Sequence, residues 1–399
     1  MALIKQLTVS GYRSIRDLTL KLDRVNVIVG PNGCGKSNLY RALYLVAAAA
    51  NGTLARALAG EGGLPSVFWA GKRHKLEKRR IAISVVLDDL TYDLEFGRIP
   101  ISDRPKHLGL EPFINDPDIK EERIVFQNDA GKDIVLLQRD RSRMMARNMD
   151  GRPTESALSV MESESVLSGL REPHKFPELS LLRQRFLSWR FYHKFRTDLH
   201  SPLRQPQIGI LTPVLAHDGV DLAAAIATIK AIGDGDYFDE AIDKAFPGSA
   251  VSICSSSGEF QIEMSAPKFK RDLDCKELSD GTLQYLCLLA ALLSPRPAPF
   301  LAINEPETSI HPDLFQPLAE LIVHASESTQ IWLTTHSRDL ANYIVKLKSQ
   351  AKVTELEKVE GATRIVGLPV SQIEKEEEEG FWDDTEQHES GHVIDRLSR

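Results

Sequence analysis

The chain has 399 residues, of which 42% are hydrophobic and 26% charged, and its formal net charge at pH 7 is −7. This composition allows a globular protein with a sizeable core, and it excludes nucleic-acid binding driven by overall charge alone. No stretch approaches the roughly 18 uncharged apolar residues of a membrane span, and the N-terminus lacks the features of a signal peptide. The four cysteines have no CxxC spacing, so we expect a reduced, cytoplasmic protein without disulfides, zinc or a membrane partner.

Residues 1–98 show the patterns of several strands and one apolar helix. Some segments alternate between apolar and polar residues, and one is continuously apolar, which predicts a buried strand. A glycine-rich turn follows that strand and leads into an alanine-rich segment, which predicts a helix packed against a sheet. The expected strands are residues 3–9, 18–22, 25–29, 81–87 and 92–96, and the expected helix is residues 36–50.

Residues 99–204 differ in character from the rest of the chain. The segment is polar, carries scattered prolines, and lacks the sustained heptads of a long coiled coil. We expect a partly helical inserted domain, with a mobile loop near residues 148–154.

The α/β pattern returns in residues 205–347. Strand and helix patterns alternate there, which predicts a parallel sheet covered by helices on both faces. Residues 348–399 begin with an expected hairpin and continue into an acidic run whose like charges predict a solvated, mobile tail. The expected strands are residues 251–254, 260–264, 299–303 and 330–334, and the expected helices are residues 222–232, 237–246, 283–293, 312–325 and 338–346.

Residues 30–37, GPNGCGKS, fit the pattern GxxxxGK followed by Ser or Thr. They lie between an expected buried strand and an expected helix, which favours a nucleotide-binding loop over a chance glycine turn. Glycines let backbone N–H groups converge on phosphate oxygens, and the helix N-terminus adds a favourable dipole. We expect Lys36 to reach the β- and γ-phosphates of ATP and the Ser37 hydroxyl to bind Mg²⁺. The other nucleotide contacts in this region are assigned to Asn32, Gly33, Cys34, Gly35 and Asn38.

Two of these positions have a second interpretation. The thiol of Cys34 could act as a redox switch, although a small residue whose backbone N–H contacts phosphate is the favoured interpretation. Asn38 also fits a packing position on the helix.

Three further motifs follow: LSDGT at 278–282, FLAINEPE at 300–307 and IWLTTHS at 331–337. Glu305 follows an apolar strand, so we expect it at the strand's carboxyl end beside the nucleotide. A carboxylate there can orient and deprotonate the attacking water, and a structural acid near the metal is the alternative. His336 also ends a buried strand.

The LSDGT motif precedes an apolar helix. Ser279 and the N–H groups around Gly281 therefore lie at a helix start, which is a second place for an anion. An ordinary N-capped helix is the alternative.

Taken together, the motifs resemble those of the ATP-binding cassette (ABC) ATPases, whose signature motif is LSGGQ. Within them, the chain is most similar to the RecF- and SMC-like branch, and to single-chain RecF-like ATPases with an EPE…HP stretch and a TTHS ending. The resemblance covers about residues 3–45 and 205–345. It implies an α/β fold, the head of an ABC-type P-loop ATPase with a mixed sheet flanked by helices and a partly helical insertion.

The resemblance also implies roles for single residues. Ser279 and Gly281 would contact the γ-phosphate of ATP bound by a second copy, so that two heads form a homodimer around ATP. His336 would be the switch histidine that contacts the γ-phosphate in its own site. Residues 307–312 match a segment that crosses the dimer interface and connects the two sites.

The chain departs from the family pattern at Asn304, where the Walker B strand usually ends in aspartate. Asparagine offers a carbonyl oxygen to Mg²⁺ but no charge, so we expect weaker metal binding and slow hydrolysis. A nucleotide sensor that scarcely hydrolyses ATP is the alternative. The family's metal-coupling glutamine has two candidates, Gln127 and Gln205, and neither has a diagnostic context.

The turn at Tyr12 and Arg13 corresponds to the place where related heads put residues over the nucleotide. Arg13 is expected to contact phosphate and Tyr12 to stack on adenine. A solvated turn is the alternative.

Three basic clusters are candidates for DNA contact. Such clusters neutralise phosphates without reading sequence, and interleaved aromatic residues could stack on unpaired bases. Ordinary solvated faces are the alternative. The clusters are Lys72, Arg73, His74, Lys75, Lys78, Arg79 and Arg80; Arg139, Arg141, Arg143 and Arg147; and Arg183, Arg185, Arg190, His193, Lys194 and Arg196, with Trp189, Phe191 and Tyr192 among them.

The leading interpretation is an ATPase that uses ATP and Mg²⁺ in DNA maintenance or in defence against phage and plasmids, beside a separately encoded effector or nuclease. A scaffold that binds ATP only to dimerise is the second interpretation. A transporter nucleotide-binding domain is the third, but the spacing of about 240 residues between Lys36 and Ser279 is too long for it.

Overall fold

The computed structural model describes residues 3–72, 79–98, 115–128, 131–140, 143–148, 151–155, 161–169 and 172–367. Nearly all of them belong to one unit, formed by residues 1–71 and 79–366. The acidic tail expected after the C-terminal hairpin lies outside the described residues.

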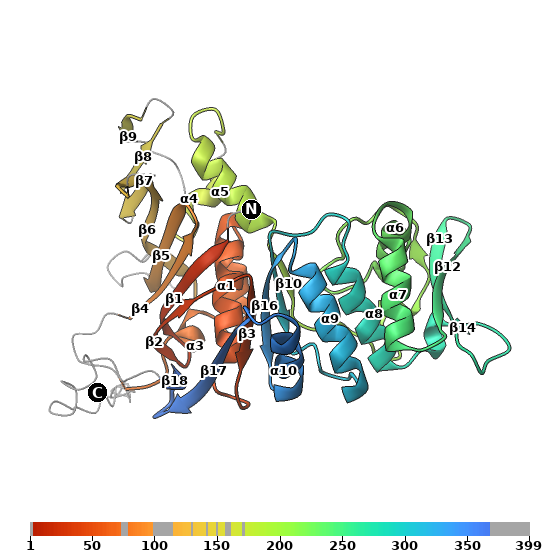
Figure 1. Cartoon of the computed structure of the whole chain (residues 1–399). Helices are drawn as coiled ribbons and strands as arrows, with labels where there is room; N and C mark the ends of the chain where they lie inside the picture. The colour runs from red at the N-terminus through yellow and green to blue at the C-terminus, as the bar shows by residue number, and fades with distance from the viewer. Residues whose placement is uncertain are drawn as a thin grey trace, which may run out of the picture. The chain divides into compact units, whose positions relative to one another are not determined.

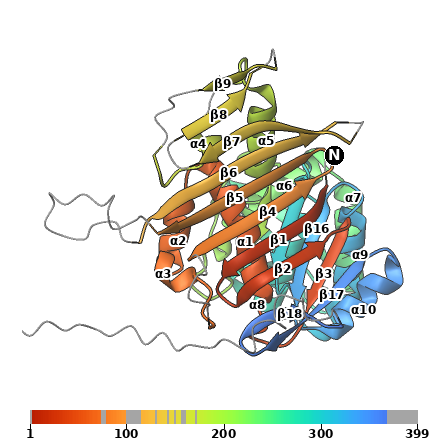
Figure 2. The same ribbon diagram turned by 90° about the vertical axis from the view of Figure 1, so that its left-hand side faces the viewer.

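The first sheet has eight strands in the order β2-β1-β4-β5-β6-β7-β8-β9, and Figure 2 shows them side by side. Every neighbouring pair is antiparallel. Alternate residues are buried along β4, as expected for a sheet with one face against the core. The strands are β1 (Ile4–Tyr12), β2 (Ile15–Lys21), β4 (Arg80–Leu87), β5 (Leu90–Arg98), β6 (Pro117–Gln127), β7 (Asp133–Asp140), β8 (Arg143–Arg147) and β9 (Pro153–Glu155).

The second sheet has six strands in the order β10-β15-β16-β3-β17-β18. The first five are mutually parallel, and β18 pairs with β17 as an antiparallel hairpin. This hairpin is the one predicted after residue 348. The strands are β3 (Val25–Val29), β10 (Arg190–Tyr192), β15 (Phe300–Asn304), β16 (Gln330–Thr335), β17 (Lys352–Val359) and β18 (Ala362–Ile365).

Helices cover both faces of the parallel sheet, as the sequence predicts. Ile28, Ala302 and Trp332 pack into the cluster that includes α1 and the antiparallel sheet. Val27 and Leu333 belong to a second cluster that contains the apolar residues of α8, α9 and α10. Helix α1 therefore lies between the two sheets (Figure 1). The helices are α1 (Lys36–Asn51), α8 (Asp280–Leu292), α9 (Phe315–Ala325) and α10 (Arg338–Leu347).

A smaller four-stranded sheet packs against two further helices (Figure 1). Val251, Ile262 and Met264 from this sheet join the cluster that surrounds α8. The elements are β11 (Gln207–Ile208), β12 (Ala250–Ser256), β13 (Glu259–Ser265), β14 (Leu273–Asp274), α6 (Leu222–Ile232) and α7 (Gly235–Ala245). The remaining short helices are α2 (Leu54–Gly60), α3 (Leu64–Val67), α4 (Val166–Gly169) and α5 (Pro177–Leu187), with 3-10 turns at Pro202–Arg204, Cys275–Glu277 and Pro312–Leu314.

The segment 99–204 is partly helical, as expected, with α4, α5 and the 3-10 turn at Pro202–Arg204. The sequence did not predict its strands: β6 to β9 continue the antiparallel sheet, and β10 joins the parallel one. Strand β6 buries Asp118, Lys120 and Glu122. These charged residues hide the apolar alternation from which a strand is recognised.

The loop expected near residues 148–154 coincides with the turn between β8 and β9. Residues 149 and 150 lie outside the described residues, and the mobility of the loop stays a prediction. Strands β8 and β9 pair there, with Arg147 opposite Pro153.

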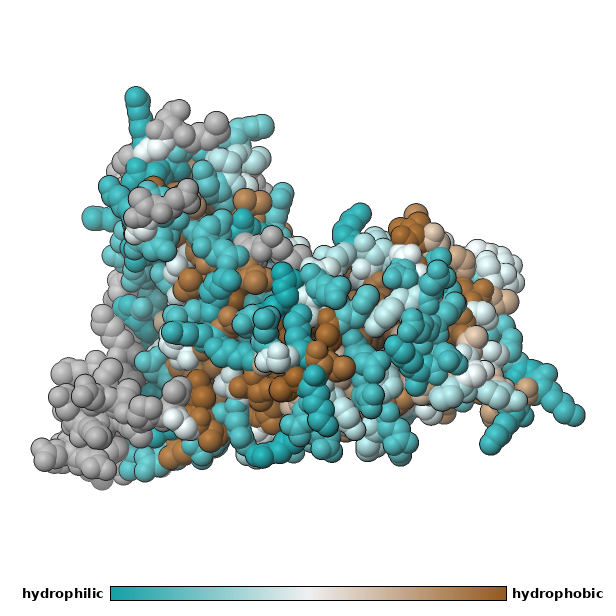
Figure 3. Space-filling model, in the orientation of Figure 1, coloured by the Kyte–Doolittle hydropathy of each residue, from teal (hydrophilic) through white to brown (hydrophobic). Residues whose placement is uncertain are grey.

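Hydrophilic side chains cover most of the face shown in Figure 3, with hydrophobic ones between them. None of the described helices is long and apolar enough to cross a membrane.

Candidate active site

The glycine-rich loop connects β3 to α1, as predicted. Gly33 has a φ of 78° and Gly35 a φ of 107°, a left-handed region that glycine enters without a Cβ penalty. No atom of the described residues lies within 4 Å of the position that a Cβ of Gly33 would take. Gly35 is the N-cap of α1 and has no side chain to cap the helix. The backbone N–H groups of this helix start therefore fit a phosphate group.

Lys36 is 4% exposed. Its Nζ donates to the carbonyl oxygens of Gly30 and Pro31, at 2.7 and 3.1 Å. The loop thus holds the buried ammonium group beside the place where the sequence puts the phosphates.

Cys34 is also buried. A Cβ on Gly30 would lie 2.7 Å from its Sγ atom, so the thiol fills the space under the loop. This placement fits the small packed residue and offers no support for a redox switch.

Asn38 connects three elements of the head. Its Nδ2 donates to Ser14 Oγ at 2.8 Å, and Ser14 Oγ lies 2.7 Å from Thr363 Oγ1. Helix α1 is thereby tied to the β1–β2 turn and to β18. These contacts fit a packing role for Asn38, and its contact with nucleotide stays a prediction.

The β1–β2 turn is arranged around a carboxylate that the sequence did not single out. The Glu61 side chain is 1% exposed, and its Oε2 lies 2.7 Å from Arg13 Nη2. Tyr12 is fully buried and donates its hydroxyl to the same oxygen at 2.6 Å. Burial, reinforced by Glu61, raises the pKa of Tyr12. The expected stacking of Tyr12 on adenine is therefore wrong, because the ring belongs to the core.

Strands β15 and β16 end side by side, with Asn304 opposite Thr334. Thr334 Oγ1 donates to Asn304 Oδ1 at 2.9 Å, so one lone pair of the amide oxygen is already in use. Glu305 follows with a φ of 47°, and its backbone N–H donates to Thr334 O at 2.8 Å. A left-handed conformation in a non-glycine residue costs on the order of 1–3 kcal/mol and is retained mainly at functional sites.

The buried Glu307 carboxylate contacts the inner side of the His336 ring and orients it. Its Nδ1 lies 2.9 Å from Glu307 Oε1, and its backbone N–H and the Thr335 hydroxyl donate to the same oxygen at 2.8 and 2.6 Å. The Glu307 side chain is 2% exposed and that of His336 is 51% exposed. An Nδ1–H donated inward leaves Nε2 as the acceptor on the exposed side of the ring.

The sequence interpretation put Glu307 in a segment that crosses the dimer interface, and this role of the segment stays a prediction. The Glu307 side chain itself is buried within the head. Thr308, Ser309 and His311 of that segment are exposed. The EPE spacing does not show that Glu307 points inward and Glu305 outward. Glu305 has a positive φ, so the chain turns there and the alternation of the strand ends.

The LSDGT motif begins α8, and Ser279 is its N-cap, accepting from Thr282 N at 3.1 Å. A Cβ on Gly281 would lie 2.5 Å from the carbonyl oxygen of Ser309. Only glycine allows this approach, which joins the signature loop to the segment after Glu305. The contact of Ser279 and Gly281 with a nucleotide held by a second copy stays a prediction.

Arg204 anchors this loop and was not recognised in the sequence. It is 5% exposed and donates to Leu278 O and Asp280 Oδ1, both at 2.7 Å. Its other N–H groups donate to the carbonyl oxygens of Thr197, Asp198, Cys275 and Lys276. In the sequence, Arg204 is one of many arginines in a basic region, and no pattern distinguishes it from the others.

Neither candidate for the metal-coupling glutamine lies at the carboxyl edge of the parallel sheet. Gln127 ends β6 in the antiparallel sheet. Gln205 caps the 3-10 turn after Arg204 and is exposed. The residue that follows the edge strand β10 is instead His193, because Tyr192 is opposite Ile303 of β15.

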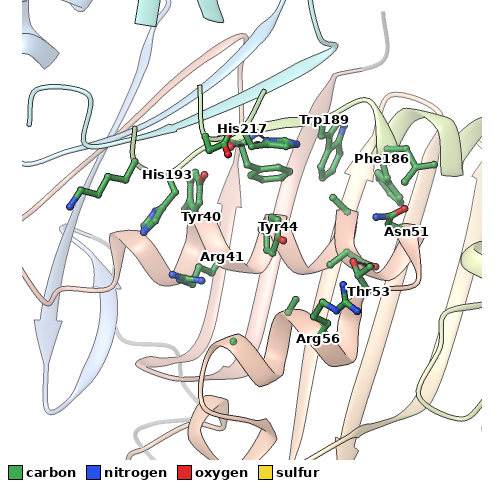
Figure 4. Close-up of a pocket in the computed structure, with 18 residues that line it drawn as sticks. Tyr40, Arg41, Tyr44, Asn51, Thr53, Arg56, Phe186, Trp189, His193 and His217 are labelled. Atoms are coloured by element: carbon green, nitrogen blue, oxygen red, sulfur yellow. Dashed lines mark hydrogen bonds between the residues drawn. The ribbon is translucent and has the colours of Figure 1, made fainter. Parts of the chain in front are cut away.

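A cavity of about 690 Å³ opens beside α1 (Figure 4). Arg41, Arg56, Lys194 and His193 line it together with aromatic residues of α1 and of the segment 186–191. Partial desolvation at the cavity and the Arg41 charge lower the pKa of His193, whose side chain is still solvent-exposed, and the Glu305 carboxylate opposes this shift. His193 therefore lies within electrostatic reach of Glu305, the expected general base.

The basic clusters are largely used within the fold. Trp189, Phe191 and Tyr192 are at most 5% exposed, so the expected stacking on bases is wrong. Arg139 is buried and donates to Met161 O at 3.2 Å. The arginines at 80, 147, 183, 185, 190 and 196 also have partners within the chain, while residues 73–78 and 141 lie outside the described part.

Fold and site define the class of the protein: an ABC/RecF/SMC-like P-loop ATPase with the fold of an SMC head. Residues 25–341 match the family described as "AAA domain, putative AbiEii toxin, Type IV TA system", and the chain belongs to this family. No curated protein matches the chain significantly.

The fold is similar to that of an Smc head domain with an extended coiled coil, from Pyrococcus furiosus, bound to the C-terminal domain of ScpA. The TM-score is 0.51 at 15% identity, covering 95% of this chain and 99% of that one. An SmcHead bound to the C-winged helix domain of ScpA has a TM-score of 0.49 at 16% identity, covering 93% and 99%. The SMC head domain from Thermotoga maritima has a TM-score of 0.43 at 16% identity, covering 92% and 99%. Only the first of these supports the fold, and none transfers a function.

Proposed function

We propose that the protein binds and slowly hydrolyses ATP with Mg²⁺ and that ATP joins the ATPase heads of two copies in a head-to-tail arrangement. The observation that carries this proposal is the contact between Gly281 and Ser309. It places the signature loop and the segment after the catalytic strand in one continuous surface, which a second copy can present to the γ-phosphate held by Lys36.

The residues at the carboxyl edge suit the chemistry of this reaction. Ser37 and Asn304 offer the hard oxygen donors that Mg²⁺ prefers, and bound ATP would supply the charge that neutral Asn304 lacks. Among the described residues, no group of three or more His, Cys, Asp or Glu side chains could hold a metal by itself. Glu305 would orient and deprotonate the attacking water, and His336 would place Nε2 near the γ-phosphate.

Two inactive variants test whether each site is shared between copies. Lys36→Ala removes the phosphate lysine, and Ser279→Arg blocks the signature loop. Mixed in equal amounts, they form heterodimers that contain one intact site if Lys36 and Ser279 come from different copies. We expect about a quarter of the wild-type ATPase rate to return from random pairing of the chains. No recovery, together with ATP-independent mass in light scattering, would contradict the shared site.

The rate of hydrolysis separates an enzyme from a sensor. Asn304→Asp restores the missing charge and should lower the Mg²⁺ concentration needed for half-maximal ATP binding by about tenfold. If wild type hydrolyses ATP no faster than Glu305→Gln, the protein is a nucleotide-dependent scaffold instead of an ATPase.

A role in defence, beside a separately encoded effector or nuclease, is the broader part of the proposal. Its support is the family description, which names a putative toxin and a type IV TA system. Among the described residues, DNA contact is proposed through the cations at the cavity and Arg143. Unchanged ATPase rate and dimerisation on addition of duplex and single-stranded DNA would remove it.

A further inference from the structure

The carboxyl edge of the parallel sheet contains one polar residue to which no role has been given. Strands β10, β15 and β16 are neighbours, and they end in His193, in Asn304 and Glu305, and in His336. Since the carboxyl ends of parallel strands meet at one edge, Glu305 lies between two histidines. Strands lie about 4.8 Å apart, so the backbone of His193 lies next to that of Asn304.

The other side of His193 faces helix α1. The His193 and Tyr40 rings lie 5.6 Å apart between centroids, with an interplanar angle of 36°. Figure 4 shows His193 beside Tyr40 and Arg41 at one end of the cavity. Tyr40 lies three residues after Ser37, on the same face of the helix. The imidazole is therefore about one helical turn from the hydroxyl expected to bind Mg²⁺.

His193 is exposed, and no hydrogen bond to its ring is made by the described residues. His193 thus follows the strand next to the one that ends in Asn304, and its ring packs about one helical turn from Ser37. An imidazole accepts a hydrogen bond from a metal-bound water, and Mg²⁺ usually keeps several waters.

We propose that His193 holds a water on the Mg²⁺ ion of the ATPase site, and so positions the metal on the side that Asn304 leaves without a charge. This rests on the proposed function. His193 is a positioning residue that acts through water, and it connects the metal site to the cavity along α1. A packing partner of Tyr40 is the competing role.

Three substitutions separate the two roles. His193→Phe keeps a ring against Tyr40 but removes the hydrogen-bond acceptor. His193→Ala removes both, and His193→Gln retains an acceptor without the ring. Lys194→Ala is the matched control, because it changes the next exposed residue of the same cavity.

The measurement is binding of a fluorescent, slowly hydrolysed ATP analogue at increasing Mg²⁺, with EDTA as the metal-free reference. For His193→Phe and His193→Ala we expect about a tenfold higher Mg²⁺ requirement, with metal-free binding unchanged. His193→Gln should stay within about threefold of wild type, and Lys194→Ala should match it. Mn²⁺ bound in the ternary complex, followed by its electron paramagnetic resonance, should show the same order.

Two results would overturn the proposal. Wild-type Mg²⁺ dependence in His193→Phe would assign the ring to packing, as would equal weakening of binding with and without metal. Failure of wild-type protein to bind the analogue at all is a different result, which would overturn the proposed function as well.

Discussion

The two large sheets treat their charged residues in opposite ways. In the antiparallel sheet, Glu122 is fully buried and accepts hydrogen bonds from Tyr92, Ser165 and Val166, beside Arg139. At the carboxyl edge of the parallel sheet, the Glu305 carboxylate makes no hydrogen bond or ion pair with the described residues. The hydrogen bonds of Glu122 are formed within the protein, so this cluster stabilises the fold. The Glu305 carboxylate keeps its hydrogen-bonding capacity for a ligand.

The difference should first be visible in catalysis. Glu305→Gln keeps the size of the side chain and removes the base, so we expect the rate of phosphate release to fall by about 10²- to 10⁴-fold. ATP binding and the urea midpoint should stay near wild type, because nothing in the fold depends on the carboxylate. If the urea midpoint falls together with the rate of phosphate release, Glu305 has a structural role, and the two sheets do not differ in the way described above.

The reverse pattern is expected in the antiparallel sheet. Arg139→Met removes the cation beside Glu122 and leaves the carbonyl oxygens of Met161 and Glu164 without this donor. We expect the free energy of unfolding to fall by about 3–5 kcal/mol. Nucleotide affinity of the folded protein should be unchanged in fluorescence titrations. A selective loss of ATP binding would instead connect this cluster to the site.

Glu307 tests the comparison further, because it is a buried carboxylate whose partner, His336, lies at the carboxyl edge of the parallel sheet. Glu307→Gln weakens the hydrogen bond to Nδ1 of His336, and we expect the ATPase rate to fall by about tenfold at unchanged ATP affinity. The control is Asp313→Asn. Asp313 pairs with His311 at 3.3 Å, but both side chains are over 70% exposed. Equal decreases in ATPase rate for the two substitutions would show that Glu307 does not act by orienting His336.

The smallest expected effect is on pH dependence. Burial raises the pKa of Glu122 above its ordinary value of 4.5, so the fold favours the neutral carboxyl. Its contribution to stability is complete below about pH 4.5 and is lost as the pH rises through the raised pKa. The unfolding free energy of wild type, relative to that of Glu122→Gln, should therefore decline as the pH rises above about 4.5. Parallel profiles would show that Glu122 stays charged throughout.

Much of the fold was readable from local patterns. The buried strand before Gly30, the helix after it and the N-cap at Ser279 depend on residues that are contiguous in the chain. The strand β6 was missed because its buried charges at 118, 120 and 122 are satisfied by partners that no periodicity reveals.

By itself, the sequence determined the glycine-rich loop, the buried strand that ends in Asn304 and the family, because each depends on residue types at fixed short spacing. Only the tertiary structure decided which charges face a ligand and which face the core. Glu307 lies behind His336, Tyr12 and Trp189 are buried, and His193 stands beside Asn304. Burial and pairing across distant segments are properties of the packed chain, and a local pattern cannot assign a partner to a charge.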